Sequence, residues 1–246
     1  MGSNASGAGL SRMLAEQRLD QALLRLGVSF NECANIIAYD PEAGTAYWSK
    51  DHHTGKESIH VGPEVAKLDI DCIEMVLRHE LLHRSMYHGF GERYANRQLA
   101  NLTLDICINR LLFEAYPHLM LKLSKAIYSE DSQETLIALA NCASNPNRLP
   151  EPAWQQLWHF IWDRRPDGCF SSLNPSSLYF RLLRFGSENA PSAQNPFADS
   201  HSPGGPVEEA SAPKPISDAI DAVSKEVNKH LPKGSTLGDH LSDFSI

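Results

Sequence analysis

The sequence predicts an α+β fold, in which a small, mostly antiparallel sheet packs on an active-site helix and on further helices. Three short strand-like runs lie in the first quarter of the chain. Two long stretches with apolar residues at helical spacing follow them. Shorter helical patterns then continue towards the C-terminus, so most of the chain is expected to be helical.

The first helix is expected from Met13 to Leu26, where apolar residues recur at helical spacing and Gly27 provides a stop signal. Residues 1–12 are rich in Gly, Ala and Ser and are expected to form a flexible tail. Turn-forming residues such as Pro41 and Gly44 separate the strand-like runs that come next. These runs are Ile36–Tyr39, Thr45–Trp48 and Ser58–Val61.

The two long helices are expected at Asp69 to about His88, with Gly89 ending the pattern, and at Asn96 to Ala115. Pro117 lies beyond the end of the second. The shorter helical patterns cover Gln133–Cys142, Ala153–Trp162 and Ser176–Phe185. Together with the strands they give one predicted domain, residues 13–185.

A change of composition follows this domain. Residues 186–215 are rich in Ser, Pro, Gly and Ala, which predicts a disordered linker. Helical spacing returns at Ile216–Leu231, so residues 216–246 are expected to form a helical C-terminal segment.

Composition excludes several classes of protein. The formal net charge of −8, without a clustered basic stripe, argues against a nucleic-acid-binding surface. No apolar run is long enough to span a membrane, and the N-terminus lacks the features of a secretory signal. The five cysteines are widely spaced and form no C-x-x-C pair, which excludes a disulfide framework and a cysteine zinc site. We therefore expect a reducing, cytoplasmic location.

The motif that carries chemistry is HELLH, from His79 to His83. On a helix, residues four apart are rotated by about 400°, so both histidines project from one face and can hold one zinc ion. Glu80 then lies where it can act as general base towards a zinc-bound water. The position of the motif, late in an apolar helix that follows strands, is that of the zincin arrangement.

A catalytic zinc needs a third protein ligand, and the sequence offers two candidates. Asp105, 22 residues after His83, lies in an apolar stretch of the second long helix, where a metal would account for a charged residue. Asn109 follows one turn later and is expected to orient a ligand histidine. His88 is the alternative, but on an unbroken helix it is rotated about 140° away from the ligand face.

Groups that contact the substrate are expected close to the motif. His88, Arg93 and Tyr94 follow it and are candidates for binding substrate or stabilising an oxyanion. The strand Ser58–Val61 is expected at the edge of the sheet, where an extended peptide adds as a further strand.

Residues 55–112, GKESIHVGPEVAKLDIDCIEMVLRHELLHRSMYHGFGERYANRQLANLTLDICINRLL, resemble the metallopeptidase domain found N-terminal to a VWA-like domain in bacterial proteins. The resemblance covers roughly residues 14–115, with weaker similarity to about residue 185. It rests on HELLH with His88 and Arg93 after it, and on the helix that contains Ala100, Asp105, Ile108 and Asn109. It implies a zincin-like fold, zinc peptidase activity and MoxR-type AAA ATPases as partners. By the same resemblance, residues 216–246 are expected to lead towards a VWA-like domain that is absent from this sequence.

The sequence therefore predicts a zinc-dependent hydrolase of peptide bonds, with His79, His83 and Asp105 as ligands and Glu80 as the base. A metal-binding adaptor without catalysis, acting in a complex with an AAA ATPase or a VWA protein, is one alternative. A metal-dependent ribonuclease is the other, although the acidic charge and Glu80 argue against it.

Overall fold

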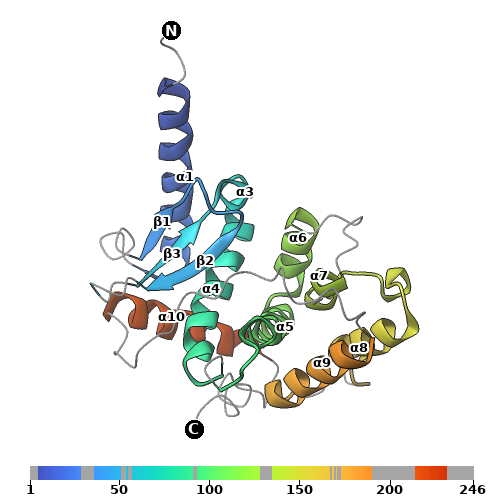
Figure 1. Cartoon of the computed structure of the whole chain (residues 1–246). Coiled ribbons are helices and arrows are strands. Elements are labelled where there is room, and N and C mark those ends of the chain that lie inside the picture. The colour runs from blue at the N-terminus through green and yellow to red at the C-terminus, as the bar shows by residue number, and fades with distance from the viewer. Residues whose placement is uncertain are drawn as a thin grey trace. The chain divides into compact units, whose positions relative to one another are not determined.

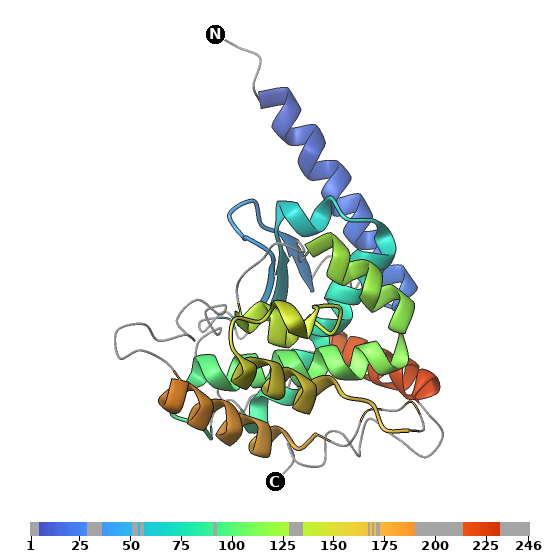
Figure 2. The same cartoon turned by 90° about the vertical axis from the view of Figure 1, so that its right-hand side faces the viewer.

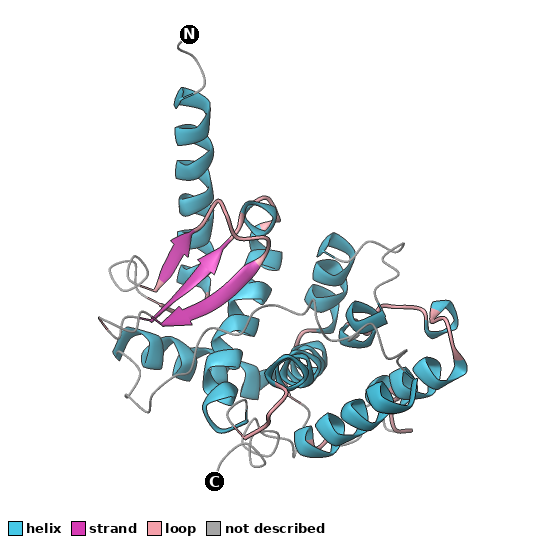
Figure 3. Cartoon of the chain, viewed as in Figure 1, coloured by secondary structure: helices cyan, strands magenta, loops and turns pink. Residues whose placement is uncertain are grey.

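The computed structural model describes residues 5–28, 36–50, 54, 57–90, 93–127, 135–166, 168, 170, 173–189 and 214–231. Over these residues the chain is mostly helical, with one small three-stranded sheet (Figures 1 and 3). The α+β prediction is therefore confirmed. None of the described helices is both long enough and apolar enough to pass through a bilayer.

The described residues form two compact units. The first contains the residues up to Arg84 together with 214–225, and the second contains Ser85 to Asn189 together with 226–231. Residues 13–185, which the sequence suggested as one domain, thus contribute to both.

The first unit contains the sheet and the beginning of the motif helix. Its elements are α1 (Ala5–Arg25), β1 (Ile37–Tyr39), β2 (Ala46–Lys50), β3 (Glu57–Val61), α3 (Pro63–Ala66) and the first part of α4 (Ile70–Phe90). The three strands lie within two residues of their predicted bounds. Helix α1 begins at Ala5, so residues 5–12, expected as part of a flexible tail, are helical instead.

The sheet has the strand order β1-β3-β2. Strand β3 pairs with β1 in parallel, with Ala38 opposite His60, and with β2 antiparallel, with Tyr47 opposite the same residue. The sheet is therefore mixed, and the prediction of a mostly antiparallel sheet is corrected. The expectation that Ser58–Val61 forms a sheet edge is wrong, because β3 is paired on both sides.

The two faces of β3 differ in burial. Glu57, Ile59 and Val61 are buried, whereas Ser58 and His60 between them are half-buried. In both views of the chain, α1 and α4 lie on the same side of the sheet (Figures 1 and 2). The alternation thus gives one face that packs against helices and one that is more open to solvent.

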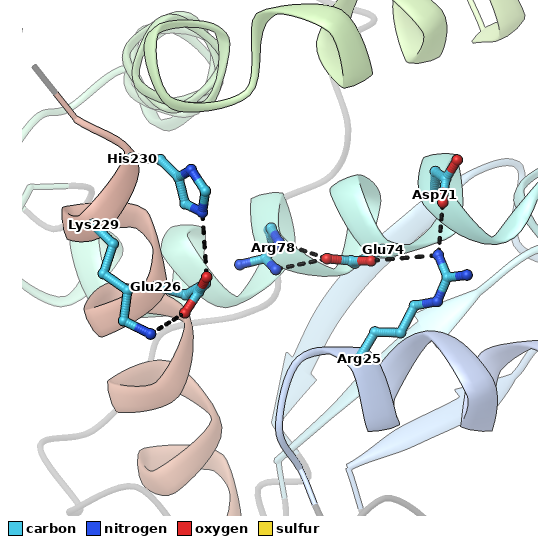
Figure 4. A network of polar contacts seen from close by, with 7 residues as sticks. All are labelled: Arg25, Asp71, Glu74, Arg78, Glu226, Lys229 and His230. Carbon is cyan, nitrogen blue, oxygen red and sulfur yellow. Dashed lines mark hydrogen bonds and ion pairs between the residues drawn. The ribbon is translucent and has the colours of Figure 1, made fainter.

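Polar contacts join α1 to the helices that follow the sheet. Arg25 Nη1 donates to Asp71 Oδ1 at 2.6 Å and lies 3.9 Å from Glu74 Oε2, and Glu74 in turn accepts from Arg78 on α4 (Figure 4). Arg18 Nη1 donates to the backbone carbonyl of Ala66 at the end of α3. These bonds tie α1 to α3 and to the first turns of α4.

The second unit is helical. It contains the end of α4, then α5 (Arg97–Ala115), α6 (Pro117–Ile127), α7 (Thr135–Ala140), the 3₁₀ turn η1 (Pro146–Arg148), α8 (Pro152–Trp162) and α9 (Pro175–Asn189). Helix α5 packs against α6, α7 and α9, and α8 packs against α7. The buried Trp162 joins α8 to α7, because its indole N–H donates to the carbonyl of Leu139 at 2.7 Å.

One prediction about this region needs correction, and one helix was not predicted. Pro117 lies beyond the end of α5, as expected, and it also begins the unpredicted α6, since proline is well suited to the first turn of a helix. The predicted linker begins later than residue 186, because α9 continues to Asn189. The last helix, α10 (Lys214–His230), agrees with the predicted helical segment, and residues 190–213 and 232–246 lie outside the described residues.

Gly62 is expected to be intolerant of any side chain. Its N–H donates to the carbonyl of Thr45 at 2.6 Å, and a Cβ added to it would lie 2.2 Å from the carbonyl oxygen of Ala43. Because both neighbours are backbone, Gly62→Ala is expected to lower the free energy of unfolding by about 1–3 kcal/mol or more, measured by urea denaturation. Gly44→Ala is the control, because a Cβ there meets no atom within 4 Å. Equal stability of the two variants would contradict the close approach.

Candidate metal centre

Helix α4 carries the HELLH motif in a buried setting. Asp69, directly before the helix, accepts a hydrogen bond from the backbone N–H of Cys72 at 3.0 Å, as an N-cap residue does. The two leucines of the motif, Leu81 and Leu82, are fully buried in the core. The apolar residues of the motif thus hold the helix in place, and its polar residues occupy the remaining face.

The two histidines lie one helical turn apart. Their ring centroids are 4.7 Å apart and their planes are inclined by 62°. His83 is buried and His79 is half-buried, as is Glu80 between them. This is the side-by-side placement that the spacing of the motif predicts.

A buried ion pair fixes the rotation of α4 next to the motif. The Arg84 guanidinium donates to both oxygens of Glu57 on β3, from Nε at 2.6 Å and from Nη2 at 2.9 Å. The side chains of Arg84 and Glu57 are only 6% and 1% exposed, and the guanidinium also lies 5.4 Å from the ring centroid of Trp48. Because Arg84 follows His83 directly, this two-pronged contact sets which way the histidine face of the helix points.

Asp105 lies in the middle of α5. Asn96 caps this helix by accepting from the backbone N–H of Leu99 at 3.0 Å. The neighbours of Asp105 in sequence, Leu104 and Ile106, are fully buried, while Asp105 itself is half-buried. The amide of Asn101, one turn earlier, lies 3.4 Å from Asp105 Oδ2 and can donate to it.

The structure brings together the three residues that the sequence predicted as ligands. One ring nitrogen each of His79 and His83 and one carboxylate oxygen of Asp105 lie within 4.8 Å of one another. In the described part of the chain, this is the only group of three or more His, Cys, Asp or Glu side chains that is placed to hold a metal. Two imidazoles and one carboxylate are a donor set that suits zinc and leaves a coordination position open.

The other predicted site residues have different surroundings. Helix α4 is unbroken through His88, whose side chain lies outside the described residues. Arg93 is exposed. Tyr94 donates its hydroxyl to Ser176 Oγ at 2.9 Å and stacks on Tyr179, which ties it to α9. A role for His88, Arg93 or Tyr94 towards substrate stays a prediction.

Asn109 also has a partner that the sequence did not indicate. Its amide donates to the carbonyl of Ala140 at the end of α7, at 3.1 Å. Its orienting role towards a histidine remains a prediction, whereas Asn101 is the amide found at the predicted carboxylate ligand. The i, i+4 spacing of Asn101 and Asp105 on one helix was the signal that could have identified it.

Two cysteines of this region have thiols with raised pKa values. Burial raises the pKa of the Cys107 thiol to about 12, and burial likewise raises that of Cys142 to about 12. Both stay protonated at neutral pH, and a thiolate is the form that binds metal or attacks carbon. The described group that is placed to hold a metal contains no cysteine, so its candidate donors are nitrogen and oxygen atoms.

The chain was compared with protein families, curated proteins and solved structures, and no family model, curated protein or solved structure matches it.

Proposed function

We propose that this chain is a zinc-dependent peptidase with a zincin-like arrangement, in which His79, His83 and Asp105 hold the metal and Glu80 is the general base. The observation that supports it is the approach of the three ligand atoms to within 4.8 Å of one another, next to a half-buried glutamate. The resemblance of residues 14–115 to VWA-associated metallopeptidase domains favours the same reaction.

The residues divide the chemistry between them. Zinc, when bound, supplies a Lewis acid that polarises the scissile carbonyl and acidifies water. Glu80 accepts the proton of the attacking water and then delivers it to the leaving amine, because one carboxylate can serve as base and then as acid. The Arg84–Glu57 ion pair keeps the helix of His83 and Glu80 in one orientation while this happens.

Metal-dependent peptide hydrolysis tests this proposal. Purified protein, loaded with zinc, is incubated with casein and with a quenched-fluorescence peptide library, then treated with a chelator and reloaded. Hydrolysis that disappears with chelation and returns with zinc is the expected result. If zinc binds but no peptide is cut, an adaptor role in a complex with an AAA ATPase or a VWA protein replaces the proposal. Cleavage of structured RNA in place of peptides would replace it with a ribonuclease.

A further inference from the structure

A second group of reactive side chains lies on the half-buried face of the sheet. Ser49 is on β2, Ser58 and His60 are on β3, and Asp40 directly follows β1. In the register of the sheet, Ser49 is opposite Ser58 and Tyr47 is opposite His60. Opposite residues of paired strands project to the same face, so strand pairing alone gathers these side chains.

The hydroxyls of Ser49 and Ser58 both lie within hydrogen-bond distance of one ring nitrogen of His60. Ser49 Oγ lies 2.9 Å from Nε2 and Ser58 Oγ lies 3.0 Å from it. The two hydroxyl oxygens are 3.5 Å apart. Since a neutral imidazole nitrogen has a single lone pair, one hydroxyl donates to Nε2 and the other donates elsewhere.

The other ring nitrogen of His60 faces a carboxylate. Nδ1 lies 3.7 Å from Asp40 Oδ2, which is an ionic contact longer than a hydrogen bond. Asp40 is itself held by the backbone N–H of Glu42 at 2.9 Å and by the hydroxyl of Tyr47 at 2.9 Å. The hydrogen bond from Glu42 has the larger effect and that from Tyr47 the next. Together they hold the pKa of the Asp40 carboxyl below its usual range, so the carboxyl is ionised at neutral pH.

Tyr47 also orients the imidazole. Its ring lies parallel to that of His60, within 5°, at a centroid distance of 4.8 Å. A carboxylate at Nδ1 favours the tautomer with the proton on that nitrogen, which leaves Nε2 as an acceptor for a serine hydroxyl. The order carboxylate, imidazole, hydroxyl is that of an activated serine nucleophile, and such contacts are often loose before substrate binds.

We propose that Ser49, His60 and Asp40 form a nucleophilic site that takes an acyl group from an activated carboxylic ester. Ser49 is assigned as the nucleophile because β2 is an edge strand of the described sheet, whereas Ser58 lies on the central strand.

The reaction is balanced within the site and its substrate. Ser49 Oγ forms a bond to the ester carbonyl carbon while its proton passes to His60 Nε2. The C–O bond to the leaving alcohol then breaks, and His60 returns the proton to that alcohol. Water, activated by the same nitrogen, later cleaves the acyl-serine bond to release the acid and restore Ser49. None of these residues belongs to the candidate metal centre, so this inference does not depend on the proposed peptidase function.

A fluorophosphonate probe tests the site, because it reacts covalently with activated serines. The full chain is labelled in its native state, with and without a chelator, and the modified residue is mapped by mass spectrometry. We expect label on Ser49 and none on heat-denatured protein, with no effect of the chelator. His60→Gln is expected to slow labelling about 100-fold or more, since the base that accepts the proton is lost. Ser58→Ala serves as the matched control and should still be labelled on Ser49.

Two results would overturn the proposal. One is native wild-type protein that is labelled no faster than denatured protein. The other is label that maps to Ser58 or to a serine outside the sheet. Mapping on the wild-type chain decides between these outcomes even if His60→Gln fails to fold. A folded His60→Gln variant that is labelled at the wild-type rate would count against the relay as well.

Discussion

Replacing Glu80 by glutamine is expected to lower kcat/KM for peptide hydrolysis by about 100- to 10,000-fold. Glutamine keeps the size of the side chain and removes its ability to take a proton. Glu80 is half-buried within α4, between the two histidines in sequence, and a side chain of the same size is expected to leave their positions unchanged. Zinc content and the thermal midpoint should therefore stay at the wild-type level. The measurement is a progress curve with a peptide identified in the library screen.

Glu64→Gln is the matched control for this variant. Glu64 lies on α3, is exposed and pairs with Lys67 at the surface, so its loss is not expected to change kcat/KM. If Glu80→Gln and Glu64→Gln have the same activity, Glu80 is not the base, and the peptide-cleaving mechanism proposed above fails even if the metal is bound.

Glu57→Gln is expected to lower the free energy of unfolding by about 3–5 kcal/mol. Glu57 and Arg84 are both buried, and their two hydrogen bonds at 2.6 and 2.9 Å join β3 to the motif helix. Removing the negative charge leaves the Arg84 guanidinium buried without its counter-ion. Urea denaturation monitored by circular dichroism measures the loss.

The surface pair of Glu64 and Lys67 again gives the comparison. Its side chains are 73% and 68% exposed, and Glu64→Gln is expected to change the free energy of unfolding by no more than about 1 kcal/mol. A loss in Glu57→Gln no larger than that in Glu64→Gln would show that the buried pair does not hold α4 on the sheet.

The sequence predicted the elements that depend on local pattern. Helices α4 and α5 were predicted within about two residues at each end, because apolar spacing and the N-caps Asp69 and Asn96 are local signals. Predictions from local pattern were incomplete where the same residue type occurs both in helices and outside them. Pro117 follows the end of α5, as expected, but it also begins α6, which was not predicted. The small residues near the N-terminus, expected in a flexible tail, belong to α1 from Ala5 onward.

Pairing over longer sequence distances was not predictable in this way. Strand β3 lies between β1 and β2, and it pairs with β1 in parallel. The residue pattern within one strand does not indicate which other strand will pair with it. The same holds for Glu57 and Arg84, which are 27 positions apart and belong to different elements. The candidate ligands were predictable because two of them form a known helical spacing and Asp105 is a charged residue in an apolar helix.

The proposed zinc site is tested most directly by the zinc affinity of three proteins, measured by competition with a chromophoric chelator. Wild-type protein, Asp105→Ala and His88→Ala are compared, since the last two remove the alternative third ligands. We expect one zinc ion per wild-type chain, an unchanged affinity in His88→Ala, and a loss in Asp105→Ala larger than the roughly 10- to 100-fold that removal of an outer partner causes. Wild-type affinity in Asp105→Ala would rule out Asp105 as the third ligand, and a chain that binds no zinc would rule out the proposed metal site.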